Sequence, residues 1–473
     1  MGAFSNVGLI FTFCLSAFKA TIATSYSFDY AAEVDFLVRQ GPRLTGSPAH
    51  NTLIDRIEGN LTSLGLEVKS DNYTFHYMAP ASTSKALSLV VDGRHMEIAS
   101  VFPYSGRTND LGTTGQLINV PGPHPNWKLA KGNIAVVSIS NPSLPYSMAL
   151  GTWDPSKRWA GNATNPLIPS DMIGETLTGA KKAGVKAVIF AWDETITPEK
   201  SHNQYLPFKF PYADIPAVFT SGETSKDILA AAKSKSSATL TLNSELIPNT
   251  QTRTIYAVVE GSGPKKSHET LLIVTHTDGT NVIEENGHIG VLQLAHDIAT
   301  VRPERTHIFV FTTGHLRIPA FTKSGKATTR WLNDHPEFWK GGNGQRRAIA
   351  GLTIEHLGAV EFQENLSTYS YSPTGKVQPE MLYASTKDLA AITQREWRGA
   401  DPSFTRVSKP ANMSQFGEGA ALSDKEIPNI SLATGPCYLL SKWDGDEHDL
   451  IDMPALTRQV RSFQALRKQL DAM

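Results

Sequence analysis

The chain has 473 residues, which is long enough for one large core or for two to three domains. Its formal net charge is −1, and no long run of Lys and Arg suggests a nucleic-acid partner. A hydrophobic content of 40% is that of a folded globular protein, which excludes a chain that is disordered throughout.

The N-terminus is predicted to be a targeting segment. Residues 7–18 are almost all apolar or small, and small residues follow at Thr21, Ala23 and Thr24. This pattern is typical of a secretory signal peptide, here over residues 1–23, and predicts a secreted, extracellular protein. The apolar run is too short to cross a bilayer, and no later run approaches that length.

Two further features bear on secretion. Six sequons predict N-linked glycans, at Asn60, Asn72, Asn162, Asn365, Asn412 and Asn429. Of the two cysteines, Cys14 lies in the predicted signal peptide, so only Cys437 remains and no intrachain disulfide can form. We interpret Cys437 as a small buried residue, because no His-Asp pair accompanies it as a nucleophile.

Next in the chain, residues 30–39 and 51–64 have the apolar spacing of helices, and strands are expected over 87–91 and 116–120. From residue 107 to residue 246 the loops are long and rich in Pro and Asn. They enclose a small alternating pattern, with strands predicted over 133–137, 187–190 and 215–219 and helices over 172–184 and 224–232. This change of character predicts a separate domain, residues 107–246, inserted into a larger one.

The larger domain is expected to comprise residues 24–106 and 247–473. Its predicted strands are residues 254–259, 271–275, 308–311, 349–354 and 429–432, and a helix over 456–470 ends the chain. Strands that alternate with amphipathic helices predict an α/β fold with a mixed, mostly parallel sheet flanked by helices.

Polar residues follow several of these strands at the point where each strand ends. They are His276 and Asp278, then Glu284 and Glu285, then His315, Glu355 and His356, and finally a run from Lys442 to Asp449 that includes His448. Each histidine alone is more often an ordinary core or surface residue. However, the carboxyl ends of parallel strands meet at one edge of a sheet, so these side chains are expected to converge. Imidazoles and carboxylates at such a place suit zinc.

These motifs resemble those of secreted zinc exopeptidases of the aminopeptidase Y and glutamate carboxypeptidase type, over almost the whole mature chain. Residues 41–47, Gly-Pro-Arg-Leu-Thr-Gly-Ser, match the N-terminal G-x-R-x-x-G-S pattern, and residues 131–219 resemble the protease-associated (PA) domain of that family. Residues 275–278, Thr-His-Thr-Asp, match its H-x-D motif. The resemblance implies that His276 is a zinc ligand and that Asp278 orients it.

The other metal-site motifs depart from the family pattern. Glu285 stands where the family has a bridging Asp, and Glu355 stands where it has a further zinc-binding Asp. The resemblance therefore implies a rearranged site, with His276, Glu285, His315 and Glu355 as ligands and one zinc ion rather than two. A last ligand would be Lys442, or His448 nearby, or no residue at all.

The general base of the family is also replaced. Its Glu-Glu pair aligns with Gly314-His315, and glycine cannot accept a proton. Glu284 or His356 could substitute, and we expect Asp278 and Glu284 to be the catalytic residues.

The resemblance thus implies a secreted zinc-dependent hydrolase that cleaves peptide or amide bonds through a metal-bound water, either an aminopeptidase or a carboxypeptidase. Two alternatives stay open. Gly314 favours an inactive homologue that binds peptide or glycan, and the same scaffold could also serve a non-hydrolytic cyclase or transferase.

Overall fold

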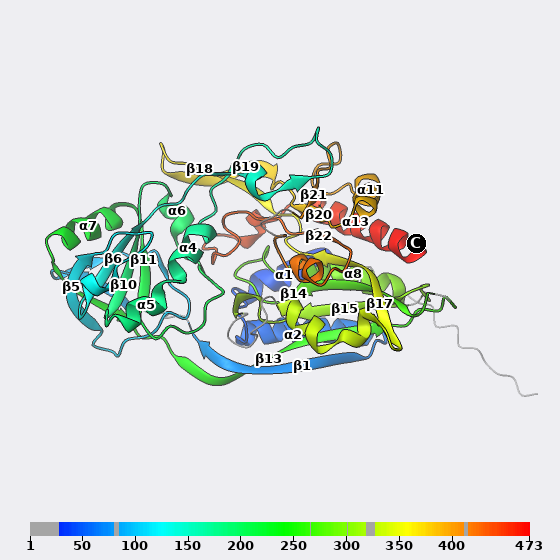
Figure 1. Cartoon of the computed structure of the whole chain (residues 1–473), viewed down its shortest axis with the longest axis horizontal. Coiled ribbons are helices and arrows are strands. Elements are labelled where there is room, and N and C mark those ends of the chain that lie inside the picture. The colour runs from blue at the N-terminus through cyan, green and yellow to red at the C-terminus, as the bar shows by residue number, and fades with distance from the viewer. Residues whose placement is uncertain (1–27, 80–84, 265, 300, 318–326, 411–414) are drawn as a thin grey trace, which may run out of the picture.

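The computed structural model of the chain describes residues 28–79, 85–264, 266–299, 301–317, 327–410 and 415–473. Within them the predicted fold class is confirmed: large mixed sheets are flanked by helices (Figure 1). The predicted signal peptide and the sequon at Asn412 lie outside the described residues. Among the described helices, none combines the length and the apolar character that a membrane span requires.

The larger sheet is parallel at its centre, and its other strand pairs are antiparallel except for β20 with β21. Its strand order is β1-β13-β15-β14-β17-β22-β20-β21-β8, with β16 beside β17. The parallel centre consists of β15 (Thr306–Thr312), β14 (Glu269–His276), β17 (Gln345–Ile354) and β22 (Asn429–Leu432). Around it lie β1 (Val68–Met78), β13 (Leu246–Val259), β16 (Lys340–Gly342), β20 (Leu382–Ala384), β21 (Val407–Lys409) and β8 (Gly151–Thr152).

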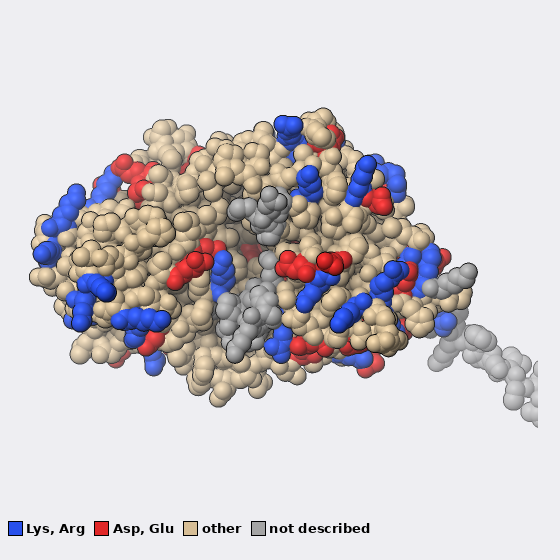
Figure 2. Space-filling model, viewed as in Figure 1, with Lys and Arg blue, Asp and Glu red and all other residues tan. Residues whose placement is uncertain are grey.

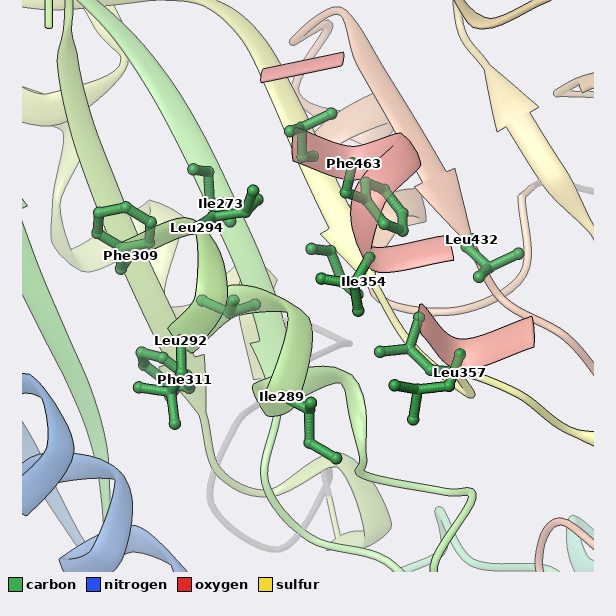
Figure 3. Packing of buried hydrophobic residues seen from close by; sticks show 14 of the residues in the cluster. Ile273, Ile289, Leu292, Leu294, Phe309, Phe311, Ile354, Leu357, Leu432 and Phe463 are labelled. Carbon is green, nitrogen blue, oxygen red and sulfur yellow. The ribbon is translucent and has the colours of Figure 1, made fainter. Parts of the chain in front are cut away.

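Helices cover both faces of this sheet, and the strand residues alternate between them. Ile273 packs with the helices of one face, whereas Leu272 and Val274 pack on the other. The first face carries α1 (Tyr30–Gln40), α2 (Pro48–Ser63), α8 (Gly287–Ala299), α11 (Lys387–Glu396) and α13 (Met453–Ala472); the second carries α10 (Ala327–Asp334) and α12 (Gly419–Asp424). Figure 3 shows the first face, where Leu292 of α8 and Phe463 of α13 meet residues of the strands. Burial on both sides explains why the central strands are continuous apolar runs.

A second, smaller unit has its own eight-stranded sheet. Its order is β3-β2-β12-β5-β6-β10-β11-β4. The strands are β2 (Leu87–Val91), β3 (Arg94–Met96), β4 (Ser100–Val101), β5 (Thr113–Asn119), β6 (Ile134–Ile139), β10 (Ala187–Trp192), β11 (Ala217–Thr220) and β12 (Ser237–Leu242). Helices α4 (Leu167–Gly174) and α5 (Leu177–Lys182) cover one face, and α7 (Gly222–Lys233) covers the other. We call residues 87–242 the second unit. It begins before the expected boundary at residue 107, because β2, β3 and β4 pair inside its sheet.

The second unit is inserted between two paired strands of the larger one. Met78 at the end of β1 is in register with Leu246 at the start of β13, so the chain leaves and returns at one place. In Figure 1 these two long strands run along the lower edge, with the second unit at the left. On the face seen in Figure 2, acidic and basic side chains of the described residues are interspersed, in keeping with the net charge of −1.

Candidate metal centre

The parallel centre of the larger sheet brings titratable side chains together at its carboxyl edge. His276 is the last residue of β14, and His315 opens the short helix η2 (His315–Arg317) that follows β15. Glu355 and His356 directly follow β17, and Glu418 precedes α12. Four of these five residues are at most 5% exposed, and His315 is 8% exposed. The sequence-predicted convergence of strand ends is therefore found for His276, His315 and Glu355.

Two overlapping groups of side chains could hold a metal ion. One consists of His276, Glu284 and His315, and the other of His276, Glu355 and His356; within each group the ligand atoms lie within 4.8 Å of one another. Nε2 of His276 lies 4.0 Å from Oε2 of Glu355, and Nε2 of His356 lies 3.9 Å from the same oxygen. Because both groups need the one available ring nitrogen of His276, they compete for a single ion.

Two of the histidines are held in the form that binds zinc. Nδ1 of His276 donates a hydrogen bond to the carbonyl of Asp278 at 3.0 Å, and Nδ1 of His356 donates to the carbonyl of Thr434. A carbonyl can only accept, so the Nε2 atom of each neutral ring carries a lone pair. Both Nε2 atoms are buried and make no hydrogen bond within the described residues. Burial lowers the pKa of each ring to about 3, which keeps both neutral near pH 7.

The third histidine has a different environment. Nδ1 of His315 lies 2.7 Å from Oε1 of Glu418, and its Nε2 lies 3.6 Å from Oε1 of Glu284. Burial opposes a charged ring here, but the hydrogen bond and charge of Glu418, together with the charge of Glu284, raise the pKa of His315 to about 9. A ring placed between two carboxylates is better suited to carry a proton than to present a lone pair.

Glu418 connects the two groups and was not foreseen from the sequence. Its Oε2 accepts a hydrogen bond from the amide of Thr328 at 2.9 Å, and its own amide donates to Oε1 of Glu355 at 2.7 Å. It thus fixes His315 with its side chain and Glu355 with its backbone. No strand of the central sheet ends at Glu418, so the strand-end pattern that identified the other residues contained no signal for it.

The two glutamates on the loop before α8, Glu284 and Glu285, point in different directions, and the one that faces the site is not the predicted ligand. Glu284 faces the site, has a buried Oε2 without a hydrogen bond in the described structure, and has a pKa that burial raises well above its usual value. Glu285, the predicted ligand, turns away and accepts a hydrogen bond from Nε of Arg43. Burial raises the pKa of Glu285 to about 7, although Arg43 opposes this. Adjacent residues in a turn point in different directions, so Glu284 takes the place expected for Glu285.

Asp278 also acts differently from what the resemblance implied. Its backbone carbonyl, and not its carboxylate, contacts His276. The carboxylate accepts hydrogen bonds from the amides of Leu316 at 2.8 Å and His315 at 3.3 Å, and from the hydroxyl of Thr45. Asp278 therefore holds η2 in place, and its carboxylate contacts the site through the amide of His315.

The remaining predicted residues lie apart from this centre. Lys442 is exposed, and His448 is an exposed residue paired with Asp35 at 3.0 Å, so neither joins the two metal-capable groups. Among the described sequons, Asn72, Asn162 and Asn365 are exposed and Asn60 is half-buried. Asn429 is fully buried in β22 and its Nδ2 donates to Ser423 at 2.9 Å, so the folded chain leaves no room for a glycan there.

Comparisons with known proteins support the fold. No protein-family model and no curated protein sequence matches the chain. Among solved structures, it is similar to a peptidase precursor from Shewanella amazonensis, with 17% identity, a TM-score of 0.63 and coverage of 94% of this chain and 93% of that one. It is also similar to a zinc aminopeptidase from Bacillus subtilis (15% identity, TM-score 0.60, coverage 94% and 95%) and an aminopeptidase from Aneurinibacillus sp. strain AM-1 (14%, 0.59, 94% and 94%). The chain thus has the fold of zinc aminopeptidases.

Proposed function

We propose that this protein is a zinc-dependent hydrolase of peptide or amide bonds. The observation that carries the proposal is the pair of buried imidazoles, His276 and His356, whose Nδ1 atoms are held by carbonyls while both Nε2 atoms face the carboxylate of Glu355. Two imidazoles and one carboxylate form a ligand set found in catalytic zinc sites. Zinc in this place would lower the pKa of a water and polarise the substrate carbonyl. This set replaces the sequence-based one, in which Glu285 and His315 were ligands.

We assign proton transfer to Glu284 and His315. Their side chains face each other at 3.6 Å, so the protonated Nε2 of His315 can give its proton to the leaving amine, and the proton that the Glu284 carboxylate takes from the attacking water can then replace it. Glu418 keeps the imidazole in the orientation that this transfer requires. Glu284 and His315 would together replace the carboxylate base, whose position in the sequence is occupied by Gly314.

Metal content is the first test. The purified wild-type chain should contain about one equivalent of zinc, removable by a chelator, and the variants His276→Gln and His356→Gln should contain less than about a tenth. His307→Gln is the matched control, because His307 is equally buried but lies at the opposite end of β15, with its Nδ1 bonded to the carbonyl of Arg305. A wild-type chain without zinc would refute the proposal.

Turnover is the second test, on a panel of amino-acid anilides, amides and short peptides. The variants Glu284→Gln and His315→Gln should keep their zinc and lose ~10²–10⁴ in kcat, the usual contribution of a general acid or base. Mass spectrometry of the products separates the alternatives, since hydrolysis adds water and cyclisation releases ammonia or water. A zinc-loaded chain with no turnover on any substrate would favour the non-catalytic binding protein.

We further propose that the chain is secreted and that the second unit corresponds to a PA domain. Exposed sequons at Asn72, Asn162 and Asn365 and the insertion of the unit between β1 and β13 support these two statements. Protein recovered from the culture medium of a eukaryotic host should begin near Thr24 and lose mass on treatment with a glycosidase. Retention of residues 1–23 would contradict the signal peptide.

A further inference from the structure

One buried asparagine joins the two loops that carry the candidate metal centre. Asn286 follows Glu284 by two residues, immediately precedes α8 and is fully buried. Its Nδ2 donates a hydrogen bond to the carbonyl of Leu357 at 2.8 Å, and its Oδ1 accepts one from the amide of Leu357 at 2.7 Å. A single side chain from the loop of Glu284 therefore holds both backbone groups of the residue that follows His356.

The backbone of His356 has an unusual conformation. Its φ is 55°, in the left-handed region that residues other than glycine adopt only rarely. Such a conformation persists only where the surrounding contacts fix it. Here Asn286 holds Leu357, and the amide of Gly358 donates a hydrogen bond to Oε1 of Gln459 at 2.7 Å. Side chains from the loop before α8 and from α13 thus hold the turn that places His356.

The start of α8 and the end of β17 lie very close together. A Cβ atom on Gly287 would lie 1.9 Å from the carbonyl oxygen of Ile354, and one on Gly290 would lie 3.0 Å from the side chain of Ile354. Only glycine at position 287 permits this approach, and the approach brings Asn286 within reach of the turn after β17. A change at Asn286 therefore acts on that turn directly.

We infer that Asn286 is a positioning residue, which keeps His356 in the conformation in which its Nε2 faces Glu355, 3.9 Å away. Without the two hydrogen bonds of Asn286 the turn relaxes from the left-handed conformation, and the imidazole of His356 moves away from Glu355. Asn286 thus favours the metal-capable group of Glu355 and His356 over the overlapping group that contains Glu284, since both need His276. The inference rests on the proposed function and adds what selects its zinc ligands.

The test compares metal binding by the full-length wild type, Asn286→Ala and His356→Gln. Competition with a chromophoric chelator gives the Kd of zinc, and saturation of the metal-free chains with cobalt(II) gives an absorption spectrum that depends on the ligands. Asn286→Ala should raise the Kd about 10–100-fold, the usual effect of losing a group that orients a metal ligand. Its cobalt spectrum should differ from that of the wild type and match that of His356→Gln, because His356 is a ligand in neither variant.

Asn141→Ala is the matched control. Asn141 is 3% exposed, and its Nδ2 also joins two segments of the chain, by donating to the carbonyl of Thr164 at 2.8 Å, but both segments lie in the second unit. This variant should keep the wild-type Kd and cobalt spectrum. If Asn286→Ala does not fold, Asn286→Leu removes the same two hydrogen bonds with a side chain of similar size.

A folded Asn286 variant with the wild-type Kd and cobalt spectrum would overturn the inference and leave the proposed function intact. Lower stability without a change in the spectrum would also overturn it, because Asn286 would then support the fold and not the ligand. A wild-type chain that binds neither zinc nor cobalt would overturn the proposed function as well, and the wild type is measured first.

Discussion

Glu418 supports two residues of the proposed site, His315 through its side chain and Glu355 through its backbone amide. Its side chain bonds Nδ1 of His315 at 2.7 Å and its amide bonds Glu355 at 2.7 Å. Glu418→Ala keeps the amide that bonds Glu355 and removes the carboxylate that bonds His315 and the amide of Thr328. We expect the kcat of hydrolysis to fall about 10–100-fold, the usual effect of losing such a supporting carboxylate.

The ring nitrogens of His315 report this role independently of turnover. In Glu418→Ala the carboxylate beside Nδ1 is lost, so the NMR chemical shifts of both ring nitrogens should change. The zinc content should stay the same. Glu380→Gln is the control: Glu380 is a half-buried residue whose carboxyl is bonded to Trp397 at 2.8 Å and Gln459 at 2.7 Å and not to residues of the site. Unchanged shifts in Glu418→Ala would show that Glu418 does not orient the ring.

Glu33 gives a pH-dependent contribution to stability. Arg56 donates to both of its oxygens, at 2.8 and 2.7 Å, and His288 lies 3.6 Å away. Burial alone would raise the pKa of Glu33, but His288 and Arg56 lower it from 4.5 to about 2. A lowered carboxyl pKa stabilises the fold above the unfolded pKa of 4.5 and loses that contribution as the pH falls toward 2.

Glu33→Gln should therefore destabilise the protein by up to about 3 kcal/mol at pH 7 and by almost nothing near pH 2. Urea unfolding of both chains between pH 7 and pH 2 measures the difference. Glu58→Gln, which removes a half-exposed partner of Arg253, is the control and should change the free energy of unfolding much less. A difference for Glu33→Gln that stays constant over the whole range would contradict this account.

At the scale of single residues, only part of the candidate site could be predicted from the sequence. His276, His315 and Glu355 were predictable, because each follows an apolar run that can only be a buried strand. Which of Glu284 and Glu285 faces the site could not be predicted. It depends on the buried Arg43, which lies 242 residues before Glu285 in the sequence and donates a hydrogen bond to it. His356 was considered only as a base, because no pattern shows that Thr434 would hold its Nδ1.

At the scale of elements, apolar runs predicted the central strands correctly, and their register brings the strand ends together. The second unit was predicted as an insertion that begins at residue 107, and strands β2, β3 and β4, which pair within its sheet, lie before that residue. Strands β3 and β4 have only three and two residues, which is too short for any apolar period to appear. Most outer strand pairs of the larger sheet are antiparallel, and this pairing depends on which edges of the central strands remain open, so it follows from the assembled sheet and not from any one strand.

Two glycines should respond in opposite ways to the same substitution. Gly279 lies in the turn after β14, where a Cβ atom would collide with Oε2 of Glu285. Gly279→Ala must displace Glu285 from Arg43, and we expect a loss of ~1–3 kcal/mol in the free energy of unfolding. Gly59 lies within α2 and is exposed, and a Cβ atom added there would meet no atom of a neighbouring element within 4 Å. Gly59→Ala should stabilise the chain by ~0.5–1 kcal/mol, because alanine loses less backbone freedom in a helix.

Chemical denaturation of the two variants beside the wild type measures both changes. Since Glu285 directly follows Glu284 of the candidate metal centre, Gly279→Ala should also lower zinc occupancy, whereas Gly59→Ala should not. Equal effects of the two substitutions would mean that the turn after β14 adjusts freely, and that its glycine is not needed for the site.

At the scale of the whole molecule, a buried ion pair joins the two units. Lys200 lies in α6 (Pro198–Ser201) of the second unit, and its Nζ lies 2.8 Å from Oε2 of Glu364 in β18 (Val360–Asn365) of the larger unit. The amide of Thr197 donates to the other oxygen of Glu364 at 2.6 Å. The two charged side chains are 1% and 7% exposed, so removing one of them leaves the other buried without its partner.

Lys200→Met should therefore cost ~3–5 kcal/mol of stability, and the double variant Lys200→Met/Glu364→Leu should recover a large part of it. The matched control is Lys181 with Asp214, a pair of which both side chains are more than half exposed and whose removal should have little effect. Urea unfolding of the two double-mutant cycles gives the coupling energies. A coupling energy for Lys200 and Glu364 no larger than that for Lys181 and Asp214 would contradict this account.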